Sequence, residues 1–266
     1  MTTSGELHMS VMDRFSLKNC CSIVTGAAMG LGKAMAAALA EVGSDIVIAD
    51  INVDEAEKTA TEIRSLGVKA LAVKSDVTNP QDADELVKKV LAEFGRIDVL
   101  INNAGISKHV KAENMKLEDW QKVLDVNLNG VFIMSQAVGQ VMIRQQKGSI
   151  INISSMSGII VNTPQCQCAY NVSKAGVIML TKSLAAEWAE HNIRVNTIAP
   201  GYMKTELTRP YFEGNSDMVK QWMALSPMKR PGTPDELQGI AVYLASDASS
   251  FCTGGVFTVD GGYTVW

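Results

Sequence analysis

From residue 20 onward, short apolar runs alternate along the chain with longer segments in which apolar residues recur at helical spacing. The short runs are apolar almost throughout, which is typical of strands that helices cover on both faces. We therefore predict strands at residues 22–25, 45–50, 70–74, 99–102, 149–153, 194–199 and 256–259.

The longer segments place apolar residues on one face and polar residues on the other, as amphipathic helices do. Asn79 and Thr233 provide signals for helix starts, and Gly95 provides one for a helix end. Strands that alternate with helices in this way predict one α/β domain, a doubly wound Rossmann-type fold with a seven-stranded parallel sheet. Helices are expected at residues 32–42, 53–66, 80–94, 117–146, 169–189 and 234–245.

Two segments fall outside this alternation. Residues 1–14 form an N-terminal extension to the domain at 15–266, which contains no visible linker or repeat. Residues 206–230 are rich in methionine, proline and aromatic residues, and we expect them to form a lid over a substrate site. No signal-peptide core or long apolar run is present, so we expect a soluble cytoplasmic protein without a membrane partner.

Composition excludes several classes of protein. The 24 lysines and arginines are dispersed among 28 acidic residues, and the net charge is −4, which argues against a nucleic-acid partner. The five cysteines and three histidines lack the spacing of a disulfide framework or a zinc site, so no metal is expected.

A glycine-rich turn, TGAAMGLG, follows the first predicted strand and leads into the first helix. Glycines at such a turn let a pyrophosphate approach the backbone at the positive N-terminus of the helix. The turn therefore predicts a site for an adenine dinucleotide. The residues expected to contact it are Gly26, Met29, Gly30, Leu31 and Gly32.

The second predicted strand ends in Asp50, 24 residues after Gly26. A carboxylate at that place can accept hydrogen bonds from the ribose hydroxyls of the cofactor. It would repel the 2′-phosphate of NADP, and neither Met29 nor Ile51 supplies a compensating cation. We therefore expect NAD rather than NADP, with Asp50 and Ile51 at the adenosine ribose. A strand-end cap is the alternative role for Asp50.

Three later segments complete a pattern. NNAG ends at Gly105, YNVSK places Tyr170 four residues before Lys174, and a PG pair follows the sixth predicted strand. Residues four apart share a helix face, so the lysine ammonium can stabilise the phenolate of the tyrosine. With the glycine-rich turn, these segments resemble the short-chain dehydrogenase/reductase family over residues 15–266.

The resemblance implies a role for each of four catalytic residues. Tyr170 would be the general base, and Lys174 would lower its pKa together with the oxidised nicotinamide and bind the nicotinamide ribose. Ser155 would hold the substrate oxygen, although Ser154 is a competing candidate for that role. Asn127 would anchor a proton relay that leads to Lys174.

The resemblance also implies cofactor contacts at the ends of later strands. Asp76 and Thr205 have a simple capping role as the alternative. The residues are Asp76 and Val77 at the adenine, Asn103, Ala104 and Gly105 at the adenosine ribose, and Pro200, Gly201, Met203 and Thr205 near the nicotinamide.

Gln165 and Gln167 bring two amides into the loop before Tyr170, where they could bind substrate hydroxyls. This loop resembles that of polyol dehydrogenases and ketose reductases of the family, so we expect a polyol or ketose substrate. Reduction of a 3-oxoacyl thioester or another carbonyl is the enzymatic alternative. A noncatalytic nucleotide sensor would be expected to lack Tyr170 or Lys174.

The family commonly forms homotetramers, and the chain ends on an aromatic residue, Trp266. That residue could cap the site of a neighbouring subunit or fill an interface. We expect a homotetramer.

Overall fold

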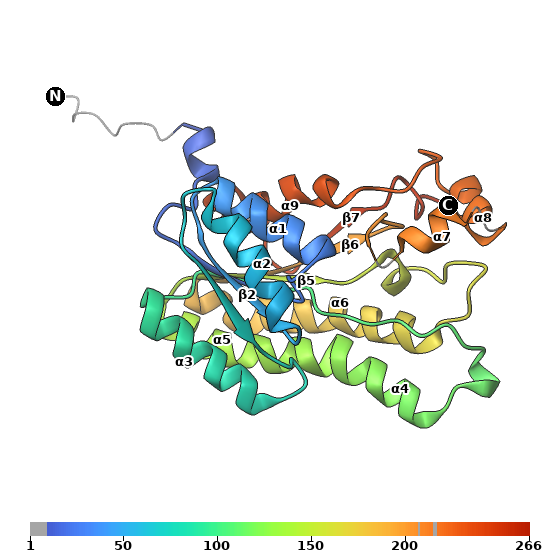
Figure 1. The fold of residues 1–266 in the computed structure, drawn as a ribbon, viewed down its shortest axis with the longest axis horizontal. Coiled ribbons are helices and arrows are strands. Elements are labelled where there is room, and N and C mark those ends of the chain that lie inside the picture. Colours follow the sequence, from blue (N-terminus) through green and yellow to red (C-terminus); the bar gives the residue numbers. More distant parts are fainter. Residues whose placement is uncertain (1–9, 207, 215–216) are drawn as a thin grey trace.

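The computed structural model describes residues 10–206, 208–214 and 217–266. Most of the N-terminal extension, and residues 207, 215 and 216 of the expected lid, lie outside the described residues. The strands form one all-parallel sheet in the order β3-β2-β1-β4-β5-β6-β7 (Figure 1). They are β1 (Cys21–Thr25), β2 (Asp45–Asp50), β3 (Ala70–Lys74), β4 (Val99–Asn102), β5 (Gly148–Ile153), β6 (Ile193–Pro200) and β7 (Val256–Val259).

Helices cover both faces of this sheet, as the uninterrupted apolar runs of its strands require (Figure 1). The helices on one face are α1 (Gly30–Glu41), α2 (Val53–Arg64) and α9 (Gln238–Ala245). Those on the other face are α3 (Pro80–Phe94), α4 (Leu117–Leu124), α5 (Gly130–Gln145) and α6 (Cys168–Trp188). Two short helices, α7 (Arg209–Glu213) and α8 (Asp217–Leu225), lie within the expected lid.

Strand alternation divides the core into two clusters, one on each side of the sheet. Val24 packs with residues of α1, α2 and α9, whereas its neighbour Ile23 packs with residues of α3, α5 and α6. Strands β1 to β6 contribute to both clusters, which explains why their sequences are apolar almost throughout, whereas β7 contributes Phe257 and Val259 to the first cluster. The predicted fold class, a doubly wound seven-stranded sheet, is confirmed.

The strand order reverses beside β1, which pairs with β2 on one side and with β4 on the other. In open α/β sheets, ligands bind outside the carboxyl ends of the strands at such a reversal. The glycine-rich turn after β1 and the NNAG segment after β4 meet at this point. The fold thus brings two of the predicted motifs together.

Several predicted boundaries need correction. The helix predicted at 117–146 is interrupted by one π-helical segment, Asp125–Asn129, between α4 and α5. The last predicted helix opens with a 3₁₀ turn, Pro234–Leu237, before α9. The predicted start of α2 at residue 53 is correct, and Asn52 caps it by accepting a hydrogen bond from the Glu55 N–H.

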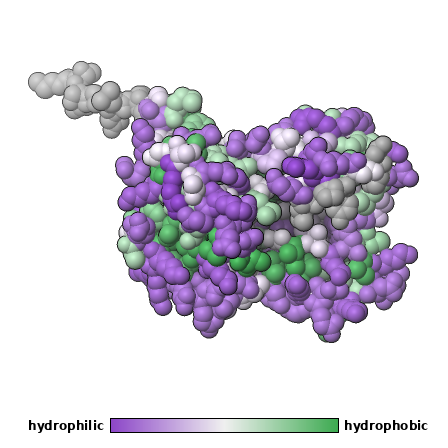
Figure 2. Space-filling view, viewed as in Figure 1, coloured by the Kyte–Doolittle hydropathy of each residue, from purple (hydrophilic) through white to green (hydrophobic). Residues whose placement is uncertain are grey.

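Among the described residues, one helical stretch, Leu117–Gln145, is long and apolar enough by composition to span a membrane. Half of its apolar window is buried inside the protein. Met134 and Val138, on α5, are fully buried against the sheet. The apolar character of this stretch is therefore that of a core helix. Figure 2 shows a largely hydrophilic surface with a hydrophobic band across the middle of the viewed face.

Candidate active site

The turn after β1 can accommodate only glycine at two positions. A Cβ atom at Gly26, where φ is +60°, would lie 2.8 Å from the Cα atom of Ala104. A Cβ atom at Gly32 would lie 2.5 Å from the Gly26 carbonyl oxygen and 2.6 Å from Nδ2 of Asn103. These glycines therefore let β1, α1 and the NNAG segment approach one another closely.

Asn103 fixes this turn through its side chain. Its Nδ2 donates to the carbonyl oxygens of Thr25 (3.1 Å) and Gly26 (2.8 Å), and its backbone N–H donates to Oγ1 of Thr25 (3.0 Å). Ala104 packs against Gly26, and Gly105 faces the catalytic candidates, since a Cβ atom there would lie 3.4 Å from Nζ of Lys174. The segment thus lies between the glycine-rich turn and Lys174.

The start of α1 fits a pyrophosphate. Met29 occupies the N-cap position and supplies no capping side chain, and the first turn holds no acidic residue. The N–H groups at a helix start carry partial positive charge and favour an anion. Gly30 has a φ of +62° and leaves the approach to this helix end open, whereas Leu31 packs against the core. The residues present therefore fit the dinucleotide cofactor.

Asp50 lies at the end of β2 beside this turn. Its Oδ2 accepts a hydrogen bond from the Ala28 N–H (3.1 Å), and its Oδ1 accepts one from the Asn52 N–H (3.0 Å). These bonds include the capping role that the sequence left open, and they hold the carboxylate in one orientation. Ile51 follows with an exposed side chain.

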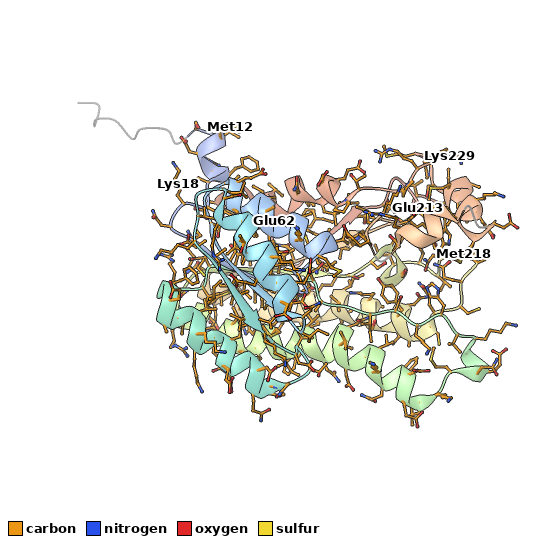
Figure 3. The ribbon with its side chains drawn as sticks, in the orientation of Figure 1. Met12, Lys18, Glu62, Glu213, Met218 and Lys229 are labelled. Carbon is orange, nitrogen blue, oxygen red and sulfur yellow. The ribbon has the colours of Figure 1, made fainter. Side chains whose placement is uncertain are left out.

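Lys33 is the nearest lysine along the chain to the glycine-rich turn. Its Nζ forms an ion pair with Oε2 of Glu62 on α2 at 2.7 Å. Figure 3 labels Glu62 on that helix. Lys33 is thus already paired with a carboxylate.

The predicted adenine contacts serve different purposes. Oδ1 of Asp76 accepts hydrogen bonds from the N–H (2.9 Å) and the hydroxyl (2.8 Å) of Thr78, so the carboxylate caps its own turn. Val77 is buried and packs against Gly130 at the start of α5. Asp76 is exposed, and its other carboxylate oxygen, Oδ2, takes no part in these two hydrogen bonds.

The segment after β6 reaches back towards the glycine-rich turn. Pro200 ends the strand, and Gly201 packs tightly against Asp260. Met203 is buried. The hydroxyl of Thr205 lies 3.1 Å from that of Thr208, which is the kind of local contact expected if Thr205 only caps its own turn.

Thr205 and Glu206 are the residues nearest to Gly30. A Cβ atom at Gly30 would lie 3.9 Å from Cβ of Thr205 and 3.8 Å from Oε2 of Glu206. Glu206 is exposed and pairs loosely with Arg209 at 3.9 Å. No sequence motif marked this carboxylate, which lies beside the glycine-rich turn.

Tyr170 lies in the first turn of α6, and Lys174 lies one turn further on. Nζ of Lys174 is 5.7 Å from the centre of the Tyr170 ring and donates a hydrogen bond to the Ile153 carbonyl oxygen (2.8 Å). The lysine is only 3% exposed, and this burial lowers its pKa to about 8. The two side chains therefore share one helix face, as their spacing predicts.

Two opposing effects act on the pKa of the Tyr170 phenol in this structure. Burial raises the pKa of Tyr170, and a hydrogen bond with Ser155 acts in the opposite direction. The lower pKa expected from the sequence requires Lys174 and the bound oxidised nicotinamide together, and it stays a prediction. In this structure the ammonium is directed at the Ile153 carbonyl, so burial determines the direction of the shift.

The two adjacent serines after β5 have separate partners. The Ser154 hydroxyl donates to the Lys174 carbonyl oxygen at 2.7 Å, which ties the strand end to α6. Oγ of Ser155 accepts a hydrogen bond from the Ser157 N–H at 3.1 Å and is the serine that bonds Tyr170. The structure thus brings Ser155, rather than Ser154, next to the tyrosine.

Asn127 is fully buried in the π-helical segment. Its Oδ1 accepts a hydrogen bond from the Ile106 N–H (2.8 Å), and its Nδ2 donates to the Ile106 carbonyl oxygen (2.9 Å) and the Ser173 hydroxyl (3.0 Å). A Cβ atom at Gly105 would lie 3.3 Å from Oδ1 of Asn127 and 3.4 Å from Nζ of Lys174. Asn127 and Lys174 therefore line the same small space.

The two glutamines of the substrate loop are engaged within the protein. Nε2 of Gln167 donates to Ser157, Asn162 and Asn171 at 3.0–3.2 Å, and its side chain is buried. The amide nitrogen of Gln167 thus bonds residues of the protein itself, which argues against the expected contact between that nitrogen and the substrate. Gln165 is partly exposed and bonds aromatic residues.

Sequence reasoning missed these aromatic partners. Nε2 of Gln165 donates to the Tyr202 hydroxyl (3.0 Å), and Oε1 of Gln165 accepts from the Trp222 indole N–H (2.8 Å). The two rings stack with centroids 4.1 Å apart. Tyr202 directly follows the PG pair, and this adjacency was the one sequence signal that could have drawn attention to it.

Comparisons with known proteins agree with this geometry. A family model described as enoyl-(acyl carrier protein) reductase matches residues 26–264. The sorbose reductase SOU1 of Candida albicans is 40% identical over 265 residues, covering 99% of this chain and 93% of that protein. A galactitol 2-dehydrogenase of Rhizobium johnstonii is 42% identical over 260 residues, covering 97% and 100%. The crystal structure of gox2181 shares 46% identity and a TM-score of 0.94, covering 97% of this chain and 100% of its own.

Other relatives differ in substrate or cofactor. A 3-oxoacyl-[acyl-carrier-protein] reductase of Synechocystis sp. is 41% identical over 247 residues, covering 92% of this chain and 97% of that protein. A probable NADP-dependent mannitol dehydrogenase of Yarrowia lipolytica is 41% identical over 264 residues, covering 98% and 94%. The match to the family model and these relatives confirm the resemblance read from the sequence motifs, and this chain belongs to the short-chain dehydrogenase/reductase family.

Proposed function

We propose that this oxidoreductase transfers a hydride between NAD(H) and a secondary alcohol or ketone of a polyol or sugar. The observation that carries the proposal is the cluster of Ser155, Tyr170 and Lys174 beside a glycine-rich turn that fits a dinucleotide. The bound nicotinamide would supply the hydride chemistry, and the chain supplies position and proton transfer.

In this mechanism the substrate oxygen lies between Ser155 and Tyr170. Ser155 donates a hydrogen bond to that oxygen, and the Tyr170 phenol exchanges a proton with it. Lys174 holds the nicotinamide ribose and supplies positive charge near the phenol. Asn127, which lines the space beside Nζ of Lys174, anchors the path by which the proton reaches solvent.

The cofactor assignment to NAD rests on charge near the adenosine ribose. The Asp50 carboxylate is held in place by two backbone N–H groups, and Ile51 is exposed and uncharged. Lys33 is paired with Glu62 and so is poorly placed to neutralise a 2′-phosphate. The ribose hydroxyls of NAD suit this environment better than the phosphate of NADP does.

The substrate class rests on the polar lining of the loop before α6 and on the relatives. Asn162, Gln165 and Tyr202 place amide and hydroxyl groups in one cluster. Sorbose and galactitol, named for two of the relatives, carry several hydroxyls, which the partly exposed Gln165 and Tyr202 of this cluster can bind. An acyl chain would gain little from them, so the 3-oxoacyl reaction of another relative is the weaker candidate.

We also propose that the chain forms a homotetramer in the cytoplasm. Phe132 on α5 and Val172 and Met179 on α6 are 44%, 49% and 61% exposed, and apolar side chains of this size suit an interface between subunits. Trp266 is exposed, although its indole N–H reaches the Leu225 carbonyl oxygen at 3.2 Å. All five cysteines are unpaired, as is usual in a reducing compartment.

The proposed function is tested by removing the phenol hydroxyl of Tyr170. Tyr170→Phe should lower kcat for hexitol oxidation with NAD by at least about 100-fold, because the general base is lost. The Kd for NAD should stay within about twofold, since the ring remains. Steady-state assays and a cofactor titration measure both quantities. A variant that keeps more than about a tenth of wild-type kcat would contradict the assignment.

A further inference from the structure

A chain of hydrogen bonds begins on helix α8, inside the expected lid. The indole N–H of Trp222 donates to Oε1 of Gln165 at 2.8 Å, and Nε2 of the same glutamine donates to the Tyr202 hydroxyl at 3.0 Å. These three residues come from α8, from the loop before α6 and from the end of β6. One glutamine side chain therefore links the lid to the segment that follows the PG pair.

The chain continues from Tyr202 to the catalytic serine. Nδ2 of Asn162 donates to the Tyr202 hydroxyl at 3.0 Å, and the Ser157 hydroxyl donates to Oδ1 of Asn162 at 3.0 Å. The backbone N–H of Ser157 then donates to Oγ of Ser155 at 3.1 Å. The Tyr202 hydroxyl is the atom at which the lid side and the serine side of the chain meet.

Most of this hydrogen-bonded chain is buried, and Gln165 and Tyr202 are its partly exposed members. Trp222, Ser157 and Asn162 are 4%, 4% and 3% exposed. The Tyr202 ring stacks on Trp222 at an interplanar angle of 13° and meets Tyr263 edge-on at 5.3 Å. A buried polar group without a hydrogen-bond partner costs the folded protein free energy. The buried amide nitrogen of Asn162 therefore depends on the Tyr202 hydroxyl.

We propose that Tyr202 is a positioning residue, whose hydroxyl holds the loop through Asn162 and Gln165 and thereby orients Ser155 towards the reacting oxygen. Because Trp222 bonds the same glutamine, the serine reaches its catalytic orientation only while α8 is packed on the site. This inference rests on the proposed function for the role of Ser155, but the hydrogen-bonded chain itself does not.

Tyr202→Phe tests the proposal, because it keeps the stacked ring and removes only the hydroxyl. For a substrate that the wild type turns over, kcat should fall about tenfold, or about 1.4 kcal/mol, while the KM for the cofactor changes by less than about twofold. Trp222→Phe, which removes the indole N–H, should change kcat in the same direction. The matched control is Tyr243→Phe, which removes a hydroxyl that contacts Cys252 on α9's side of the sheet.

Hydrogen exchange provides a readout that does not depend on the substrate. Backbone amides of residues 157–165 should exchange at least about tenfold faster in Tyr202→Phe than in the wild type, whereas Tyr243→Phe should leave them unchanged. If the wild type turns over no polyol or ketose, the proposed function fails and the exchange experiment alone decides this inference. Unchanged exchange in Tyr202→Phe, or an equal fall in kcat in Tyr243→Phe, would overturn it.

Discussion

Lys174 carries a charge in a position that water hardly reaches. Its ammonium donates a hydrogen bond to the Ile153 carbonyl oxygen, and burial lowers its pKa to about 8. A cation held in this way is poised for a ligand that brings acceptor oxygens, such as the hydroxyls of a ribose. The cost of burying this charge should therefore lower the free energy of unfolding measured without added cofactor.

The stability cost of Lys174 should depend on pH in a defined direction. The unfolded lysine titrates near about pH 10.4, so between about pH 8 and 10.4 the unfolded chain binds more protons, and the burial cost fades as pH rises. From about pH 7 to pH 10, the wild type should gain about 2 to 3 kcal/mol in free energy of unfolding relative to Lys174→Met. Urea unfolding at a series of pH values measures this difference.

Lys182→Met is the matched control, because Lys182 lies on an exposed position of the same helix α6. Its free energy of unfolding relative to the wild type should not drift with pH in this way. A difference in free energy of unfolding between wild type and Lys174→Met that stays constant from about pH 7 to pH 10 would contradict the burial of a charged ammonium.

At the level of single residues, the sequence predicted which side chains meet but not how each one is bonded. Spacing was enough for Tyr170 and Lys174, because a helix repeats its faces every three to four residues. Strand alternation left both Ser154 and Ser155 as candidates, and the deciding contacts come from α6 and from the next turn. The amide of Gln167 was expected at a substrate, yet it bonds its own loop.

Among the elements, we expect the β1–α1–β2 unit to determine the choice between NAD and NADP. We expect the wild type to prefer NAD over NADP by about 100-fold in specificity constant, because Asp50 repels the 2′-phosphate and its ribose hydrogen bond is lost. Asp50→Ser combined with Ile51→Arg should shift this preference towards NADP. Initial rates with each cofactor at a fixed ketose concentration measure the ratio.

Lys33→Met is the control for this change, since the ion pair with Glu62 already engages Lys33. Its ratio of NAD to NADP specificity constants should stay near that of the wild type. A wild type that uses NADP with the higher specificity constant would contradict the reading of Asp50. A basic side chain distant in sequence would then have to reach the phosphate.

The helical stretch around Asn127 shows a feature of an element that apolar periodicity does not predict. Apolar spacing predicted one helix over 117–146, and its ends lie within a residue of those observed. The π-helical segment at Asp125–Asn129 escaped prediction because the spacing of apolar residues does not report which carbonyl oxygen each backbone N–H bonds. Within this segment, the Asn127 amide is bonded by Ile106 and Ser173, which are distant from it in sequence.

At the scale of the whole molecule, local sequence patterns predict the sheet and its covering helices. They do not predict the contacts of the expected lid at residues 206–230. Each strand carries its own apolar run, so the alternation of strands and helices already implies the doubly wound fold. Trp222 and Gln165 are 57 positions apart in sequence, and no local rule connects them. Methionine and aromatic residues marked the lid segment as unusual, but its bonding partners depend on how the complete chain packs.

The substrate class is the central claim for the whole molecule, and it depends on the cluster formed by the loop, the end of β6 and α8. Amide and hydroxyl groups of Asn162, Gln165 and Tyr202 meet there. These groups bond one another, and the partly exposed Gln165 and Tyr202 have hydrogen-bonding capacity left that a substrate hydroxyl can use and an acyl chain cannot. Substrates with and without several hydroxyls should therefore be separated clearly.

The most direct measurement is the ratio of two specificity constants, obtained on the wild type with NADH. One is for reduction of a ketohexose such as sorbose, and the other is for reduction of a short 3-oxoacyl thioester. We predict that kcat/KM for the ketohexose is larger by at least about tenfold, which corresponds to about 1.4 kcal/mol in favour of the polyhydroxylated substrate. A larger kcat/KM for the thioester would contradict the assignment of this chain to polyols and ketoses.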